Sequence, residues 1–164
     1  MVVGLEEKLA DTAVRAQELA VGEMVTFKSG QGIREIVFGR NPTSKYEDAP
    51  EHKAFDVTQG IFPVKLLGAQ VDTSRQQFGI ARDGKGPFIL TNYSQMPLHI
   101  ENGRGEKFDL NPNMQMPLAQ NTQEMQRVKI GWRKHYEVSV QGIGTNSGDK
   151  NWSVDFKWGL VNLR

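Results

Sequence analysis

The residue types that most often carry chemistry are few in this sequence and lie far apart. The three histidines are His52, His99 and His135, and none belongs to a His-x-x-x-His or His-x-His arrangement. Ligands of zinc sites usually recur at such short spacings. A metal site would therefore require the fold to bring distant segments together, and the spacing favours three unrelated histidines.

Other motifs are equally weak. Glu47, Asp48 and Glu51 offer carboxylate oxygens to a cation, although a solvated loop is the simpler interpretation. Residues 83–86 supply too few acidic oxygens at alternate positions for a calcium loop. The glycines of 142–148 lack the spacing of a dinucleotide fingerprint, and neither a Gly-x-Ser-x-Gly elbow nor a phosphate loop occurs. We therefore expect no cofactor and no enzymatic activity.

Composition narrows the class of protein. The chain has 164 residues, 38% apolar and 24% charged, which is typical of one globular domain. The absence of cysteine excludes a disulfide scaffold and a cysteine nucleophile. A net charge of +1 favours neither nucleic acid nor an acidic membrane. No signal peptide or apolar run of about 20 residues is evident, so we expect a cytoplasmic protein with no membrane segment.

Strands are the main elements available to position side chains. From 127 to 140, even positions are apolar except Lys134 and odd positions are mostly polar, and the pattern returns over 152–160. This period of two predicts two long antiparallel strands joined by a glycine-rich loop. The first exceeds the usual length of about 5–6 residues, so Gly131 or the Arg133-Lys134 step is expected to bend it or hold a bulge. The inner faces carry all three tryptophans, Trp132, Trp152 and Trp158, which are therefore predicted to anchor the core.

A helix is predicted for 3–21, where apolar residues recur at three- and four-residue steps and Gly22 suits the C-terminal cap. After Gly22, short strand candidates separated by turn residues follow one another. They are Met24–Lys28, Ile33–Phe38, Ala54–Thr58, Ile61–Leu67, Gln77–Arg82, Pro87–Thr91, Pro97–Glu101 and Glu106–Leu110. Asn102-Gly103 predicts a type I′ hairpin turn. We therefore predict a mainly β protein, with an N-terminal helix in 1–22 and one jelly-roll-like antiparallel β-sandwich over 23–164.

Two long irregular stretches, 40–53 and 111–126, are candidates for function. The second contains Pro112 and Pro117, which stiffen it, and Met114 and Met116, which suit irregular partner surfaces. It is interpreted either as an arm that contacts another subunit or as a crossing between the two sheets.

The layout of a short helix over 3–21, a cysteine-free sandwich, the stretch 111–126 and paired strands ending near 160–164 resembles the small jelly-roll cement or decoration proteins, and other minor virion proteins, of tailed phages. The resemblance covers the whole chain and rests on no specific motif. It implies a non-enzymatic homo-oligomer, such as a trimer, that assembles in the host cytoplasm and stabilises capsid subunits in a virion. Its candidate interface residues are Pro112, Met114, Met116, Pro117, Leu5 and Leu9.

Two other classes remain open. Sandwich domains also serve as glycan-binding modules, for which Tyr46 and Tyr93 are the candidate aromatic contacts because the tryptophans have core parity. An enzyme with a cupin-like or lyase-like sandwich is the third class, and the scattered histidines favour it least.

Overall fold

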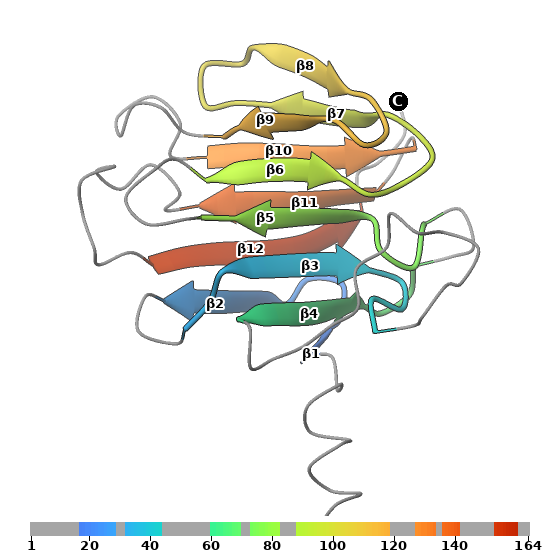
Figure 1. Ribbon diagram of the computed structural model, residues 1–164, viewed down its shortest axis with the longest axis vertical. Helices are drawn as coiled ribbons and strands as arrows, with labels where there is room; N and C mark the ends of the chain where they lie inside the picture. The colour runs from blue at the N-terminus through green and yellow to red at the C-terminus, as the bar shows by residue number, and fades with distance from the viewer. Residues whose placement is uncertain are drawn as a thin grey trace, which may run out of the picture.

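The computed structural model describes residues 17–28, 32–43, 60–69, 73–82, 88–118, 127–133, 136–141 and 153–160. Within these ranges the chain forms twelve strands in two six-stranded sheets. The sheets pack against each other as a sandwich (Figure 1). No helix among these residues has the length and apolarity needed to cross a membrane.

Sheet A contains the only parallel pairs among the described strands, because β4 pairs in parallel with both β1 and β3. The remaining strand pairs of sheet A are antiparallel. Its order is β1 (Gln17–Leu19), β4 (Ile61–Leu66), β3 (Glu35–Gly39), β5 (Phe78–Ala81), β6 (Ile89–Asn92) and β9 (Gln115–Pro117). Sheet B is antiparallel throughout. Its order is β2 (Met24–Lys28), β12 (Ser153–Leu160), β11 (Tyr136–Gln141), β10 (Arg127–Trp132), β7 (Leu98–Glu101) and β8 (Lys107–Leu110). The predicted sandwich, mostly antiparallel, is confirmed at this level.

Aromatic side chains join the two sheets. Phe38 of sheet A and Phe156 of sheet B lie with ring centroids 4.9 Å apart. Trp132 and Trp158 stack at 5.6 Å with their rings 10° from parallel, and both are fully buried. Each indole N–H is satisfied, by Thr73 Oγ1 at 3.0 Å and by the Leu67 carbonyl at 2.9 Å respectively. The prediction that these two tryptophans anchor the core is confirmed; Trp152 lies outside the described residues.

The predicted long strand over 127–140 is wrong. It is a hairpin in which β10 pairs with β11, and the chain reverses after Trp132, with Arg133 at a φ of 56°. The loop between Trp132 and Tyr136 has three residues, so even-numbered residues face even-numbered ones across the hairpin. Even-numbered residues therefore remain apolar on both sides of the turn, and the alternation in the sequence does not show that the chain reverses there.

The predicted helix over 3–21 does not include 17–19, which form β1 and pair in parallel with β4. Leu19, assigned to the helical stripe, is instead buried in the core of the sandwich. Residues 3–16 lie outside the described residues.

Most of the other predicted strands occur within one or two residues of the predicted bounds, and Met24–Lys28 coincides with β2. Ala54–Thr58 lies outside the described residues. The sequence did not predict β1 or β9, both only three residues long.

Candidate functional site

The candidate site lies on the outer face of sheet B, where β11, β10, β7 and β8 run side by side. In one cross-strand row, Lys129 faces Glu101, which faces Lys107. In the next row, Gly131 faces His99, which faces Asp109. Charged side chains from four strands thus gather on one surface.

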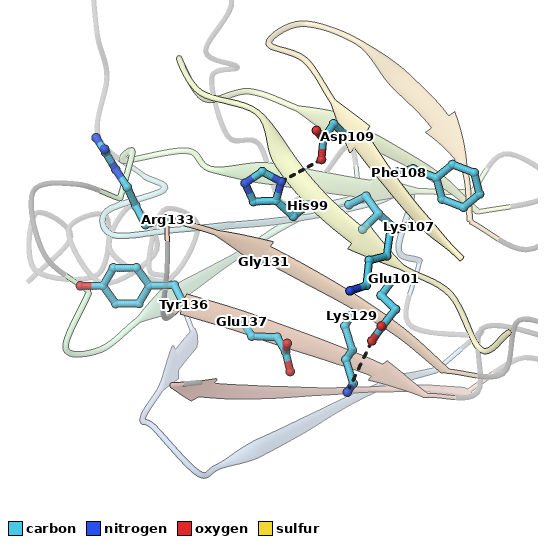
Figure 2. A pocket seen from close by; sticks show the side chains of 11 residues that line it. His99, Glu101, Lys107, Phe108, Asp109, Lys129, Gly131, Arg133, Tyr136 and Glu137 are labelled. Atoms are coloured by element: carbon cyan, nitrogen blue, oxygen red, sulfur yellow. Dashed lines mark hydrogen bonds and ion pairs between the residues drawn. The ribbon is translucent and has the colours of Figure 1, made fainter. Parts of the chain in front are cut away.

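The centre of this surface is hollow. Gly131 has no side chain, and its neighbours on the two sides are His99 and Glu137. The resulting open depression has a volume of about 490 Å³. A Cβ atom on Gly131 would lie 3.3 Å from the Tyr136 carbonyl oxygen and 3.7 Å from the His99 carbonyl oxygen, so a side chain there would pack closely against the two neighbouring strands. Figure 2 shows the charged residues around the hollow.

A hydrogen bond and an ion pair orient the side chains (Figure 2). His99 Nδ1 donates to Asp109 Oδ1 at 2.8 Å, and Lys129 Nζ lies 3.6 Å from Glu101 Oε2. All four residues are at least one-third exposed, so each pair contributes at most about 1 kcal/mol to stability. The site is therefore a hydrated, hydrogen-bonding surface rather than a dry pocket that strengthens electrostatic interactions.

The described residues contain no group of three or more His, Asp or Glu side chains placed to hold a metal ion. His99 is paired with Asp109 and does not converge with another histidine among the residues whose placement is given. His52 and His135 lie outside the described residues, as does the acidic cluster of 47–51.

The β7–β8 hairpin forms one border of the site, and its turn differs from the prediction. The Gly105 N–H donates to the Asn102 carbonyl at 3.0 Å, and Gly105 has a φ of 81°. The loop is thus a three-residue type I turn with a bulge at Gly105, not a type I′ turn at Asn102-Gly103. The Asn102 Oδ1 atom accepts hydrogen bonds from the N–H groups of Arg104 and Glu106, which favours this conformation.

Strand β8 ends sheet B and pairs only with β7 among the described strands. Figure 1 shows that β8 lies beyond β9, the edge strand of sheet A. Phe108 faces Ile100 across β7 and β8, so its ring is on the core side, yet it is 40% exposed. The inner face of β8 is therefore left partly uncovered at Phe108, whereas Leu110 on the same face is buried in the core. In Figure 2 the Phe108 ring points away from the charged residues of the hollow.

In the stretch predicted as an arm or a crossing, residues 111–114 connect β8 of sheet B to β9 of sheet A. Met116 of β9 faces Leu90 of β6 and packs against the core, and Leu118 is fully buried. Met114 is 55% exposed, and Pro112 and Pro117 are partly buried. Residues 119–126 lie outside the described residues, as do Leu5 and Leu9.

Of the two predicted glycan contacts, Tyr93 is buried on the outer side of sheet A. Its hydroxyl donates to Glu35 Oε2, and a Cβ on Gly79 would lie only 2.4 Å from that oxygen. Burial first, and the Glu35 carboxylate second, raise the pKa of Tyr93 well above its usual range. Its ring offers no open face to a sugar. Tyr46 lies outside the described residues.

Sequence reasoning did not identify this surface as a site. A signal was present: Glu101, Lys107, Asp109 and Lys129 all occupy odd positions of strands whose even positions are apolar. The odd positions show that these residues share the outer face, but the sequence does not show that β10 pairs with β7.

Comparisons with known proteins give no match: no family model, no curated protein and no solved structure matches this chain.

Proposed function

We propose that this protein is a non-enzymatic structural protein that associates with copies of itself. The observation that carries the proposal is the edge at β8, where backbone groups beside the exposed Phe108 ring have no partner among the described strands. Proteins usually protect such an edge with a proline, a bulge or a covering segment. The residues of β8 are all non-proline and regularly paired with β7. An edge of this kind suits the addition of another strand.

Charged side chains are also a common protection of sheet edges. On β8 the two outward charges, Lys107 and Asp109, have opposite signs. These charges repel a strand that places a positive charge opposite Lys107 or a negative charge opposite Asp109. They favour a strand that places a negative charge opposite Lys107 and a positive charge opposite Asp109.

We extend the proposal to the assembly that the layout of the chain suggests. Capsid subunits are the proposed second partner, and a virion is the proposed location, with the protein acting as a symmetric homo-oligomer. This part rests on the resemblance to minor virion proteins alone.

Sedimentation velocity over a wide range of protein concentrations tests the self-association. We expect a species heavier than one chain that grows with concentration, and co-sedimentation with capsid particles. A single-chain species at every concentration, both alone and with particles, would contradict the proposal.

A second candidate function is glycan binding, and the hollow over Gly131 is the observation that favours it. Carboxylate, imidazole and ammonium groups surround a depression open to solvent. Such groups donate and accept hydrogen bonds with sugar hydroxyls. Of the two aromatic residues that line the depression, Tyr136 is buried and Phe108 is 40% exposed.

Glycan-array binding followed by titration calorimetry tests this candidate. Glu137→Ala removes a carboxylate beside the hollow, and binding should weaken about tenfold because hydrogen bonds to charged groups are worth about 1.5–3 kcal/mol. Lys157→Ala, on the same face but outside the hollow, is the control. Absence of binding to any glycan, or equal loss in both variants, would exclude the hollow as the sugar site.

A further inference from the structure

On one side of β8, backbone hydrogen-bonding groups at alternate residues have no partner among the strands that the structure describes. The Asn102 N–H donates to the Glu106 carbonyl at 3.0 Å across the base of the hairpin. Because bonded pairs alternate along an antiparallel ladder, Phe108 and Leu110 bond to β7. The N–H and C=O groups of Lys107 and Asp109 therefore point to the free edge. Together with two side chains of opposite charge, they form a surface that can pair with another strand.

The other edge strands are less suited to pairing. At the two ends of β9, the Met114 carbonyl accepts from the Asn92 N–H and the Leu118 N–H donates to the Phe88 carbonyl. The nitrogen of Pro117 therefore points to the free edge and has no hydrogen to donate. On β2, the inward side chains Val25 and Phe27 are only 6% and 4% exposed, so an added strand would bury no further apolar surface on that side. Strand β1 has three residues and pairs in parallel.

We propose that two copies of this protein join through their β8 strands, which pair antiparallel about a two-fold axis at Phe108. Lys107 of each copy then faces Asp109 of the other, and the two Phe108 residues face each other. The pairs formed by Lys107 and Asp109 are the hydrogen-bonded ones, because their backbone groups point to the free edge. Sheet B becomes a continuous twelve-stranded sheet across the dimer.

Charge fixes this register. On the outer face, Lys129 faces Glu101 and Glu101 faces Lys107, and in the dimer Lys107 faces Asp109 of the second copy, which faces His99 of that copy. The signs of the charges alternate from Lys129 of one copy to Asp109 of the other. If the register shifts by one residue, the outward side chains of one strand meet the inward side chains of the other. If it shifts by two residues, Lys107 lies opposite Lys107 or Asp109 lies opposite Asp109. Like charges directly opposite each other destabilise a sheet.

Phe108 supplies the apolar part of the contact. Residues at a non-hydrogen-bonded position have their Cα atoms about 4.5 Å apart, so the two rings meet on the core side of the joined sheet. Figure 1 shows β8 beyond β9, the edge strand of sheet A, and the Phe108 ring is 40% exposed, so part of each ring is available for this contact. A four-residue strand pair buries less than the roughly 1,200 Å² of a standard interface, so a weak, concentration-dependent dimer is expected.

The inference deepens the proposed self-association and rests on it. Because the chain has no cysteine, Phe108→Cys introduces a single thiol that can form a disulfide only between copies. In the proposed register the two Cα atoms lie within disulfide range, whereas those of Asp109→Cys lie about 8 Å apart and cannot be bridged. Thr26→Cys, on the other edge strand of sheet B, reports random collision.

In a glutathione redox buffer, Phe108→Cys should form disulfide dimers on the order of tenfold faster than either control, because pairing raises the effective thiol concentration. Equal rates for all three variants would overturn the β8 pairing. Faster cross-linking of Asp109→Cys would overturn the register.

Charge exchange gives an independent test by sedimentation. Lys107→Asp places two pairs of like charges at the junction and should weaken the dimer about tenfold, as should Asp109→Lys. The double variant K107D/D109K restores opposite charges and should recover most of the affinity. Both positions are exposed, and far-UV circular dichroism of each variant checks that it is folded.

The outcomes separate this inference from the function on which it rests. An oligomer that persists unchanged in K107D and D109K overturns the β8 dimer and leaves self-association standing. A protein that stays a single chain at every concentration overturns both. A protein that is monomeric alone but binds capsid particles through β8 also overturns the dimer, because another protein's strand is then the occupant.

Discussion

Tyr93 shows how a single buried hydroxyl can shape the stability of this protein. The residue contacts Glu35 across Gly79, and burial together with the carboxylate raises its pKa above the usual value of about 10. Folding therefore requires the phenol to keep its proton. This contribution is fully present below pH 10 and is lost as the pH rises further, because the unfolded chain ionises first.

Because the pKa of Tyr93 is higher in the folded protein than in the unfolded chain, we expect the free energy of unfolding to fall between pH 9 and pH 11 in the wild-type protein. In Tyr93→Phe the fall at pH 11 should be smaller by about 1 kcal/mol, since one titrating group is removed. Urea unfolding at the two pH values measures it. Identical losses in both proteins would show that Tyr93 ionises as easily in the folded state as in the unfolded chain.

Trp132 is the residue on which the core should depend most. Its ring is fully buried, stacks on Tyr136 and Trp158, and lies 5.7 Å from Phe78 of the opposite sheet. Trp132→Ala removes these contacts and leaves the Thr73 hydroxyl without its donor. We expect a loss of about 3–5 kcal/mol in denaturant unfolding. A loss below about 1 kcal/mol would instead indicate a tryptophan available to ligands.

Turn geometry is testable at the level of the element. In the β7–β8 hairpin only Gly105 has a positive φ, and no atom lies within 4 Å of the position a Cβ would take. Gly105→Ala should therefore cost about 1–2 kcal/mol through backbone conformation alone. Gly103→Ala should be nearly neutral, whereas a type I′ turn would require the positive φ at Gly103. Thermal unfolding of the two variants compares them directly, and the reverse order would restore the type I′ assignment.

The elements that sequence predicted well are those with strong alternation, such as β2 and β12, because one buried face leaves a clear period of two. The reversal at Arg133 was missed since an odd-numbered loop preserves parity. Residues 17–19 were assigned to a helix because an alanine-rich apolar stripe precedes them, while tertiary pairing with β4 decides their structure. For the candidate site, the alternation of charged and apolar residues in the sequence indicates the charged face of β7, β8 and β10. Which charged residues meet depends on the order of the strands in the sheet.

At the scale of the whole molecule, the two sheets end differently. β8, the last strand of sheet B, lies beyond β9, the last strand of sheet A (Figure 1). β9 carries a proline, Pro117. The connection over 111–114 joins these two edges and places Met114 at the surface beside them. The end of the sandwich formed by β8 and β9 is thus the side on which association is expected.

Two methionines of this connection separate an interface role from a core role. Met114 is mostly exposed, so Met114→Ser should leave the free energy of unfolding within about 0.5 kcal/mol and weaken self-association if this end of the sandwich is the contact surface. Met116 is partly buried and faces Leu90 on the core side of sheet A, so Met116→Ser should cost about 1–2 kcal/mol through lost apolar burial. Denaturant unfolding and sedimentation of both variants supply the two readouts. If Met114→Ser changes neither quantity, association does not involve the connection, and β8 alone must account for it.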